Sequence, residues 1–343
     1  MLDQSPPQQI CLLPRLGGLG GPASFQARLT AGLEARGVTV SYDPDDPASR
    51  SILVIGGTSD LGALLRARRR GARIVQRLNG MNWIHRRRWT GLRHFLRSEV
   101  NNALLALIRA RFADEIVYQS RFSQDWWERV RGPAGKPCRV IFNAVDLEVY
   151  SPHGPGTPPP DRVRLQMVEG RLGGGNEAGL LNGVSLVEAL IRDHGLPAEL
   201  VVVGQAPDAL RAAAARRLGS AISWMGVVPR ERIPELNRSA HLFFSADLNA
   251  ACPNAVVEAL ACGLPVVSFD TGALQELVPA DAGRVVPYGA DLWRLEPPDI
   301  PALARAAAEI LPRLADYRQG ARRQAVARLG LDRMVEAYLA VFR

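Results

Sequence analysis

The sequence of 343 residues lacks several features that would place it in a membrane-bound, secreted or low-complexity class. No stretch approaches the roughly 18 consecutive apolar residues of a membrane-spanning helix, and no basic segment followed by an apolar core opens the chain. The four cysteines show no C-x-x-C spacing, which argues against a zinc cluster or a disulfide framework. The 25 prolines and 32 glycines form no low-complexity tract. We therefore expect a folded, cytoplasmic protein.

Acidic residues are absent from one long window, 66–97, which holds 11 arginines. The charge of this window exceeds the net charge of +8 of the whole chain, and Trp83, Trp89 and Phe95 interleave with the arginines. A concentrated positive surface indicates an anionic partner, either a phosphorylated acceptor or the inner face of an acidic membrane, rather than a nucleic acid. Solvated faces of two arginine-rich helices would give the same pattern, so both interpretations stay open.

Short apolar runs alternate with helix-like segments along the chain, which is typical of parallel α/β sheets. The hydrophobic share of 47% is sufficient for two cores. The alternation stops at 151–161, where five of eleven residues are proline, and then restarts. We predict an α/β protein with two doubly wound, Rossmann-like domains at 1–155 and 156–325, followed by a C-terminal helical segment at 326–343.

The segment 252–278 carries the most informative pattern, a helix followed by a tight stop and a buried strand. Pro253 suits the first helical position, where its missing N–H costs nothing. The amide groups that then point outward together belong to Asn254, Ala255 and Val256. Such a helix N-terminus binds phosphate, and the carboxylate of Glu258 one turn later suits the ribose of a nucleoside diphosphate. An ordinary helix with Glu258 as a solvated acid would show the same spacing.

Residues 254–267 resemble the donor-site segment of retaining glycosyltransferases of family four, which have the GT-B fold, with two Rossmann-like domains facing each other across a cleft. The resemblance implies metal-independent transfer of a hexose-type sugar from a UDP- or GDP-type nucleotide sugar to an acceptor, with no cofactor. It also implies that the last helix packs back on the first domain. In that family a Glu eight residues before Glu258 contacts the donor sugar, whereas this chain has Ala250.

Several glycines lie where the first strand turns into a helix, and there they would let a phosphate approach the backbone. A Gly-Gly pair at this turn faces the donor phosphates in the family, and Gly20 and Gly21 match it. Gly18, Gly20 and Ala23 also fit the G-x-G-x-x-A pattern, with Asp43 as a ribose acceptor. An NAD(P)-dependent oxidoreductase and a plain glycine-rich turn therefore remain alternatives.

Three further positions match the family in part. Arg171, within Gly-Arg-Leu, corresponds to the Arg that reaches the diphosphate, but the Lys that follows it in the family is absent. Val227 follows a strand whose family counterpart borders the nucleotide base. Asn79 stands where many members have a His near the transferred sugar; it can bond a sugar hydroxyl but cannot act as a general base near neutral pH. The resemblance implies catalytic roles for Asn79 and Arg171.

The acidic run 43–47 contains two prolines and reads as a solvated turn rather than a metal site, so we expect no metal. Ala250, Asn79 and the missing Lys each remove a polar contact that the family uses. A subfamily with a different donor or acceptor, in which Asp247 or Asn249 replaces the Glu, would explain these departures. So would a GT-B protein that has lost transfer and serves as a binding or partner subunit.

Overall fold

The residues described by the computed structural model are 8–18, 20–173, 175 and 177–343. The chain divides into two compact units. The described residues up to Ala144, together with Gly330–Arg343, form the first unit, and Val145–Leu329 form the second. No helix within the described ranges is both long and apolar enough to cross a membrane.

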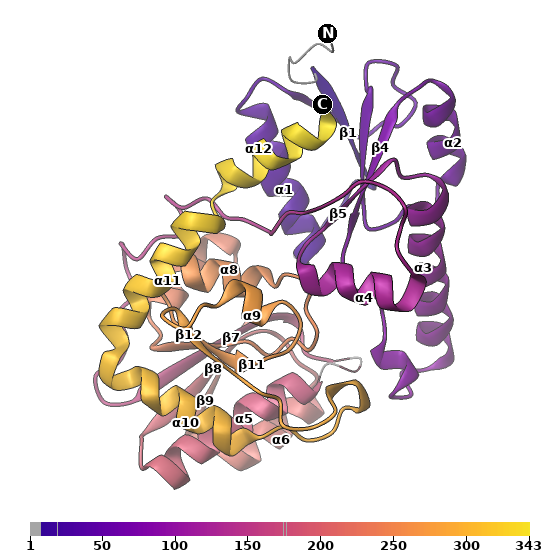
Figure 1. The fold of residues 1–343 in the computed structure, drawn as a ribbon. Helices are drawn as coiled ribbons and strands as arrows, with labels where there is room; N and C mark the ends of the chain where they lie inside the picture. The colour runs from indigo at the N-terminus through magenta and orange to yellow at the C-terminus, as the bar shows by residue number, and fades with distance from the viewer. Residues whose placement is uncertain (1–7, 19, 174, 176) are drawn as a thin grey trace. The chain divides into compact units, whose positions relative to one another are not determined.

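The first unit contains six parallel strands in the order β2-β1-β3-β4-β5-β6 (Figure 1). The strands are β1 (Gln9–Leu13), β2 (Thr39–Ser41), β3 (Ser51–Ile55), β4 (Arg73–Leu78), β5 (Glu115–Tyr118) and β6 (Cys138–Val140). The helices are α1 (Gly21–Glu34), α2 (Leu61–Arg69), the 3-10 turn η1 (Ile84–Arg86), α3 (Leu92–Arg111), α4 (Arg121–Arg131) and α12 (Leu331–Phe342). Every residue of β3 is buried, as expected for a parallel strand that helices cover on both faces.

Alternate residues of β1 enter two different cores, because successive side chains of a strand point to opposite faces. Ile10 and Leu12 pack with α1 and α12 on one face of the sheet. Cys11 and Leu13 pack with α2 and α3 on the other. Burial raises the pKa of the Cys11 thiol to about 12, with the charges of nearby aspartates adding to the rise, so this cysteine is a core residue.

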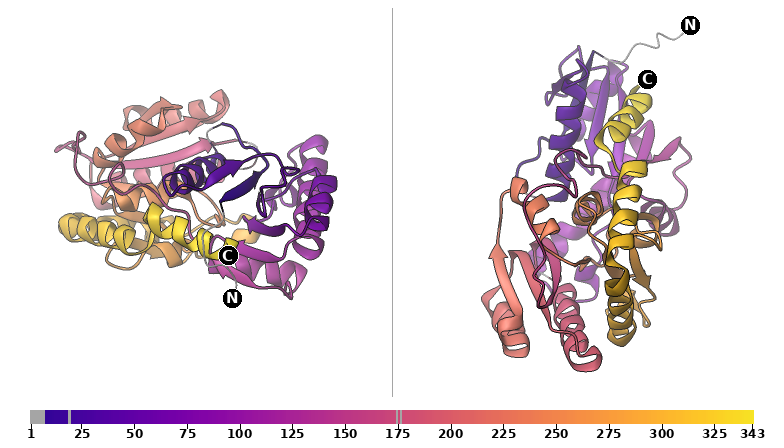
Figure 2. Two further views of the ribbon diagram at one scale, coloured as in Figure 1. Left: turned by 90° about the horizontal axis from the view of Figure 1, so that it is seen from above. Right: turned by 90° about the vertical axis from the view of Figure 1, so that its left-hand side faces the viewer.

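The second unit repeats the plan, with six parallel strands in the order β12-β11-β10-β7-β8-β9. The strands are β7 (Val163–Arg171), β8 (Ala198–Gln205), β9 (Ile222–Gly226), β10 (Leu242–Phe244), β11 (Val266–Phe269) and β12 (Gly283–Val286). The helices are α5 (Glu177–His194), α6 (Asp208–Leu218), α7 (Ile233–Arg238), α8 (Asn254–Ala261), α9 (Leu274–Leu277), α10 (Ile300–Ile310) and α11 (Leu314–Arg328), with 3-10 turns η2 (Gly219–Ala221), η3 (Arg230–Arg232), η4 (Leu292–Arg294) and η5 (Leu311–Arg313). The two further views show helices on both sides of the strands (Figure 2).

The proline-rich segment 151–161 lies inside the second unit and not between the units. Arg238 of α7 donates hydrogen bonds to the carbonyl oxygens of Pro155 (2.7 Å) and Ser151 (3.0 Å), which holds the segment against the helix. The chain passes from one unit to the other at Ala144–Val145 and again at Leu329–Gly330. The amide of Val145 donates to the carbonyl of Leu329 at 3.0 Å, so the two passages lie side by side.

The last helix, α12, belongs to the first unit and packs on α1. Val335, Tyr338 and Phe342 are buried in the core that they share with α1, and the rings of Phe25 and Tyr338 lie 5.4 Å apart. A methyl group added at Gly32 of α1 would lie 2.4 Å from a methyl carbon of Val335. The glycine therefore permits the close approach of these two helices.

Candidate functional site

The residues singled out in the second half of the sequence gather at one edge of the second sheet, where its parallel strands end. Arg171 is the last residue of β7, and Val227 directly follows β9. The loop that contains Asp247 and Asn249 follows β10 and leads into α8. Ligands of parallel α/β sheets bind at the carboxyl ends of the strands, so this edge is the candidate site of the second unit.

The residue that caps the N-terminus of α8 provides no side-chain hydrogen bond to the helix. The helix begins at Asn254, so Pro253 takes the capping position, one residue earlier than predicted, with φ −69° and ψ 120°. The amide of Val257 donates to the carbonyl of Pro253 at 3.3 Å. The amides of Asn254, Ala255 and Val256 precede this bond and have no acceptor within the helix. Together with the helix dipole they make the α8 N-terminus electropositive.

Packing holds α8 firmly in the second unit. Val256, Val257 and Leu260 are fully buried, and Gly263, at φ +70°, ends the helix. Arg322 of α11 donates to the carbonyl of Ala261 at 2.8 Å, which satisfies one of the last carbonyls of the helix. A helix fixed in this way presents its amides without reorganisation.

Glu258 lies one turn into α8 and is buried, with 8% of its surface exposed. Its position is where the sequence placed a ribose acceptor. It is not the solvated acid of the alternative interpretation, because its surface is largely covered by protein. Val227 is the opposite case, since 46% of this apolar residue is exposed directly after the left-handed Gly226.

Arg171 is exposed and its guanidinium forms no hydrogen bond or ion pair with any described residue. The strand reaches it through a β-bulge between Val168 and Arg171. Gly204, at φ +132°, makes room for this irregularity, since a methyl group there would lie 1.6 Å from the carbonyl oxygen of Glu169. The fold therefore places a cation that has no partner among the described residues at the edge at which α8 begins.

The loop after β10 contains a strained residue. Asn249 has a positive φ of 61°, which is unusual for a residue other than glycine, and is 6% exposed. Its side-chain nitrogen Nδ2 has no hydrogen-bond partner among the described residues. Ala250, in the place of the family's Glu, is held by its backbone: Ala273 donates to its carbonyl at 2.9 Å, and Gly272 leaves room for that contact.

Two carboxylates near this loop have raised pKa values. Crowding by protein atoms raises the pKa of Glu169 well above its usual range, and the negative charge of Asp247 adds to the rise. Loss of hydration raises the pKa of Asp247 to about 6. The Asp247 side chain nevertheless reaches the surface, where water reduces the effect of burial on its pKa. Such pairs are common at functional sites.

In the first unit the glycine-rich turn follows β1 and leads into α1. Gly20 caps α1 with φ −70° and ψ 164°, a conformation open to any residue. A methyl group added there would meet only Pro22, at 4.0 Å, so packing within the unit does not require this glycine. Gln26 steadies the turn by accepting from the amide of Leu16 at 2.7 Å. Gly21 is the first residue of α1.

Asn79 follows β4 and belongs to a polar network that the sequence did not predict. Its side-chain oxygen accepts hydrogen bonds from Arg77 (3.1 Å) and from Gln119, which follows β5. Arg77 also donates to Asn143 at 2.6 Å and stacks on Phe25, with 3.6 Å between the guanidinium carbon and the ring centre. The sequence did hold one indication of this network, because Asn79 and Gln119 each directly follow one of two neighbouring parallel strands.

Asp43, Asp45 and Asp46 serve the turn that contains them. The amide of Asp45 donates to Asp43 at 2.9 Å, which leaves the proposed ribose acceptor of the oxidoreductase alternative engaged locally. Asp45 pairs with Arg66 at 2.7 Å, and Asp46 accepts from the amide of Ala48 at 2.9 Å. In the portion of the chain described, no three His, Cys, Asp or Glu side chains are grouped so that they could hold a metal ion.

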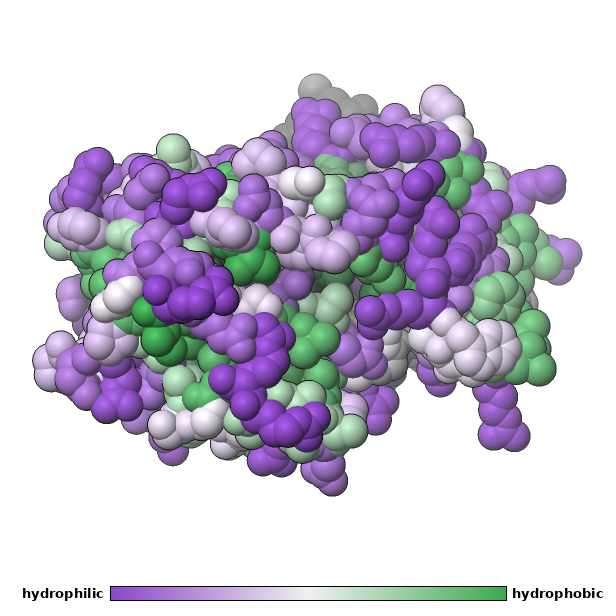
Figure 3. All heavy atoms as spheres, turned by 90° about the horizontal axis from the view of Figure 1, so that it is seen from below, coloured by the Kyte–Doolittle hydropathy of each residue, from purple (hydrophilic) through white to green (hydrophobic). Residues whose placement is uncertain are grey.

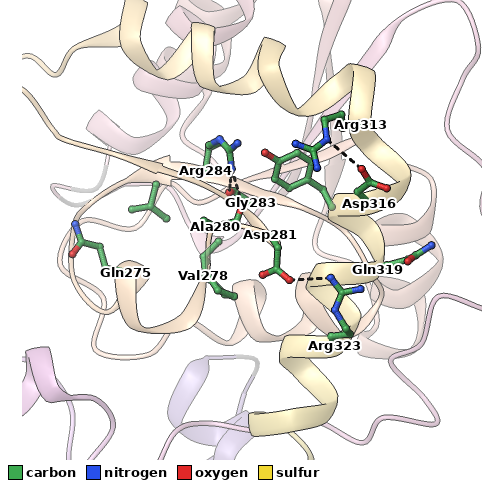
Figure 4. A pocket seen from close by; sticks show the side chains of 13 residues that line it. Gln275, Val278, Ala280, Asp281, Gly283, Arg284, Arg313, Asp316, Gln319 and Arg323 are labelled. Carbon is green, nitrogen blue, oxygen red and sulfur yellow. Dashed lines mark hydrogen bonds and ion pairs between the residues drawn. The ribbon is translucent and has the colours of Figure 1, made fainter.

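A surface pocket of about 920 Å³ lies elsewhere in the second unit, beside β12 and α11 (Figure 4). Residues 278–281, which lead into the amino end of β12, form one wall. The pocket therefore lies at the other end of that strand from the α8 edge. Its arginines are engaged, since Arg323 pairs with Asp281 at 2.9 Å and Arg313 with Asp316 at 3.2 Å. We assign no ligand to it.

The protein belongs to the two-domain α/β class, because each of its two Rossmann-like units contains an all-parallel six-stranded sheet. The carboxyl edge of the second sheet is suited to binding an anion. Residues 167–312 match the family model of the glycosyl transferases group 1. A stretch of 150 residues, 42% of this chain, is 29% identical to a phosphatidylinositol N-acetylglucosaminyltransferase subunit of Arabidopsis thaliana. That match spans 32%, about a third, of the length of the curated relative.

Solved structures resemble the whole chain. Sucrose-phosphate synthase from Thermosynechococcus elongatus superposes with a TM-score of 0.73 at 16% identity, covering 98% of both chains. HepE of Anabaena, in complex with UDP and glucose, gives a TM-score of 0.68 at 16% identity, covering 97% of this chain and 99% of its own. The fold is thus the GT-B fold that the resemblance implied. The family model and the curated relative make glycosyltransferases the class of protein that this chain resembles.

Proposed function

We propose that the protein is a retaining glycosyltransferase that transfers a sugar from a nucleoside diphosphate donor to an acceptor still to be identified. One observation carries the proposal: the N-terminus of α8 and the exposed Arg171, which has no ion-pair partner among the described residues, lie at the same carboxyl edge of one sheet. Amides at a helix N-terminus and a guanidinium are the groups that bind a diphosphate. The UDP complexes of structurally similar HepE favour a UDP donor.

The proposed chemistry is stabilisation of the leaving group. Negative charge grows on the diphosphate as the bond between the anomeric carbon and the phosphate oxygen breaks. The amides of Asn254, Ala255 and Val256 and the guanidinium of Arg171 stabilise that charge more strongly in the transition state than in the ground state. These groups supply positive potential at the diphosphate, so the proposed reaction is metal-independent. Gly20 and Gly21 are proposed to bind the donor phosphates too.

Glu258 is the proposed partner of the ribose hydroxyls, and Val227 the proposed neighbour of the base. Asn79 is proposed to bond a sugar hydroxyl. The Asn79 side-chain oxygen already accepts from Arg77 and Gln119, so its NH₂ group remains the donor for a ligand. Asp247, which reaches the surface, is proposed to contact the sugar in place of the missing Glu, with Asn249 as a positioning residue inside the loop.

A non-catalytic GT-B subunit is the second candidate. The buried Ala250 favours it, because no carboxylate stands where the family contacts the donor sugar. Thermal unfolding with UDP, GDP, ADP and NAD separates the candidates from each other and from an oxidoreductase. We expect a nucleoside diphosphate to raise the melting temperature and its sugar conjugate to be hydrolysed slowly. Binding without hydrolysis or transfer favours the non-catalytic subunit, and stabilisation by NAD alone contradicts both.

Two variants test the assigned roles by titration calorimetry. Arg171→Ala should weaken the binding of both UDP and inorganic diphosphate about 10-fold or more, because a charge-assisted bond contributes roughly 1.5–3 kcal/mol. Glu258→Gln should weaken the binding of UDP but not of inorganic diphosphate, since it acts on the ribose.

The matched control is Arg216→Ala, which removes an exposed arginine of α6. If Arg171→Ala binds UDP and diphosphate as tightly as this control does, the assignment of Arg171 to the site is contradicted. Equal losses for UDP and diphosphate in Glu258→Gln contradict a ribose role.

A further inference from the structure

The arginine-rich window 66–97 does not form one positive surface. Arg66 and Arg70 pair with Asp45, at 2.7 and 3.5 Å, and Arg73 pairs with the buried Glu115 at 2.5 Å. Arg77 is 1% exposed, so the expectation that it contributes to a surface is wrong. Pairing and burial therefore reduce the positive charge that the first half of the window presents, although Arg68 and Arg69 stay exposed.

The second half of the window behaves differently. Arg87, Arg93 and Arg97 are exposed, and none forms an ion pair or hydrogen bond with another described residue. The nearest acid along the chain, Glu99, is paired with Arg86 at 2.6 Å. That Arg86 contact and a hydrogen bond from His85 lower the pKa of Glu99 to about 2, so the acid stays ionised and engaged.

Apolar side chains lie next to these arginines in the open. Leu92, Leu96 and Val100 of α3 are 61%, 54% and 66% exposed. Their spacing of four residues puts them on one side of the helix. Arg93 and Arg97 each follow one of the leucines by one residue, so they lie about 100° further around the helix axis. The buried side of α3 is supplied by other residues, namely Ser98, Asn102, Leu105, Ile108 and Arg109. The helix therefore carries a second apolar stripe that no described part of the protein covers.

Trp89, just before the helix, is the most exposed large hydrophobic residue of the described chain at 78%. We call Trp89, Leu92, Leu96 and Val100, with Arg87, Arg93 and Arg97, the α3 face. On the right-hand side of Figure 3, the side on which Figure 1 draws α3, hydrophobic residues lie directly beside hydrophilic ones. Contiguous exposed apolar surface of this kind marks an interaction site.

We propose that the α3 face binds the surface of an anionic lipid bilayer. Aliphatic and indole side chains beside unneutralised arginines match a boundary between apolar chains and negative headgroups. A second copy of this chain would oppose arginines to arginines, and such like-charge contacts cost several kcal/mol. Nucleic acid does not account for the leucines and the valine, which cannot stack on bases as aromatic rings do.

Flotation of the full-length chain with vesicles tests the proposal. We expect binding to vesicles that mix phosphatidylcholine with phosphatidylglycerol, little binding to phosphatidylcholine alone, and a decrease with added salt. Arg93→Gln/Arg97→Gln should weaken binding about 10-fold or more, since each arginine near such a surface contributes roughly 1 kcal/mol. Leu92→Ser/Leu96→Ser should weaken it to a similar extent by removing the apolar contact.

Matched controls come from the second unit. Arg216→Gln/Arg305→Gln removes two exposed arginines, and Val326→Ser removes a valine that is 56% exposed. Circular dichroism verifies that each variant folds. Equal binding to neutral and anionic vesicles overturns the proposal, as does unchanged binding in both α3 variants. If the parent protein is a dimer and Leu92→Ser/Leu96→Ser makes it a monomer, the α3 face binds a second copy of the chain and the proposal is overturned. UDP affinity, measured separately, reports on the proposed function alone.

Discussion

Asn249, in the loop at the carboxyl edge of the second sheet, combines two features that cost free energy. Asn249 has a left-handed backbone and a buried nitrogen without a partner among the described residues. Each feature costs of the order of 1–3 kcal/mol. Strain of this kind is common in loops that hold functional groups, and the same loop carries Asp247. The sequence indicated Asp247 and Asn249 only because they lie close to Ala250, the position eight residues before Glu258 at which the family has a Glu.

The raised pKa of Asp247 predicts how stability depends on pH. Its folded pKa, about 6, lies above the ordinary value of 3.8, so between these values the folded state binds more protons than the unfolded state. The stability contributed by this group therefore falls as pH rises from about 4 to 6. Asp247→Asn should raise the melting temperature at pH 7 relative to the parent, and the gain should disappear near pH 4.

The matched control for this experiment is Asp125→Asn, which changes an exposed aspartate of α4. Its effect on the melting temperature should be small at both pH values. A gain in Asp247→Asn that is as large at pH 4 as at pH 7 would show that ionisation of Asp247 is not its cause.

The burial of Arg77 shows what a single sequence cannot reveal about a residue. The run of arginines around it predicted a positive surface. Its partners Asn143 and Phe25 lie 66 and 52 positions away in the chain, and only the closed sheet brings them together. Charge counts along a chain therefore overestimate positive surface wherever arginines point into a fold.

Most secondary-structure elements were predictable because their patterns are strong. The sequence from about 90 to 112 predicts a long helix, and the structure has α3, Leu92–Arg111, there. The apolar run 199–204 predicts a strand, and it forms β8, Ala198–Gln205. The edge strand β12, Gly283–Val286, was not predicted, because four residues with a glycine and an arginine give no clear apolar run. The short helix α9, Leu274–Leu277, was also not predicted, because four residues are too few to show helical periodicity.

The packing of α12 on α1 gives a prediction at the level of elements. Gly32→Ala should destabilise the protein by about 1–3 kcal/mol, because the new methyl group would lie 2.4 Å from Val335. Val335→Ala removes the obstructing methyl groups, so in that background Gly32→Ala should cost much less. Urea unfolding of the two single variants and the double variant measures the coupling.

Additive effects in that cycle would contradict the contact between the two helices. A stabilising Gly32→Ala in both backgrounds would mean that alanine acts only through its higher helix propensity.

For the whole molecule, the sequence predicted two Rossmann-like domains but not where the chain passes between them. The prolines of 151–161 looked like a linker, and only Arg238, more than 70 residues later, turns that segment into part of the second unit. The passages at Ala144–Val145 and Leu329–Gly330 have no compositional signal of their own. Their pairing through Val145 and Leu329 is a contact between distant parts of the chain.

The proposed function depends on a diphosphate being held by the amides at the start of α8 and the guanidinium of Arg171. A crystal structure of the protein soaked with UDP tests it most directly. We expect diphosphate oxygens within hydrogen-bond distance of the amides of Ala255 and Val256 and of the guanidinium of Arg171. UDP bound in the pocket beside β12 and α11, or a diphosphate that leaves those amides without a phosphate oxygen, would contradict it.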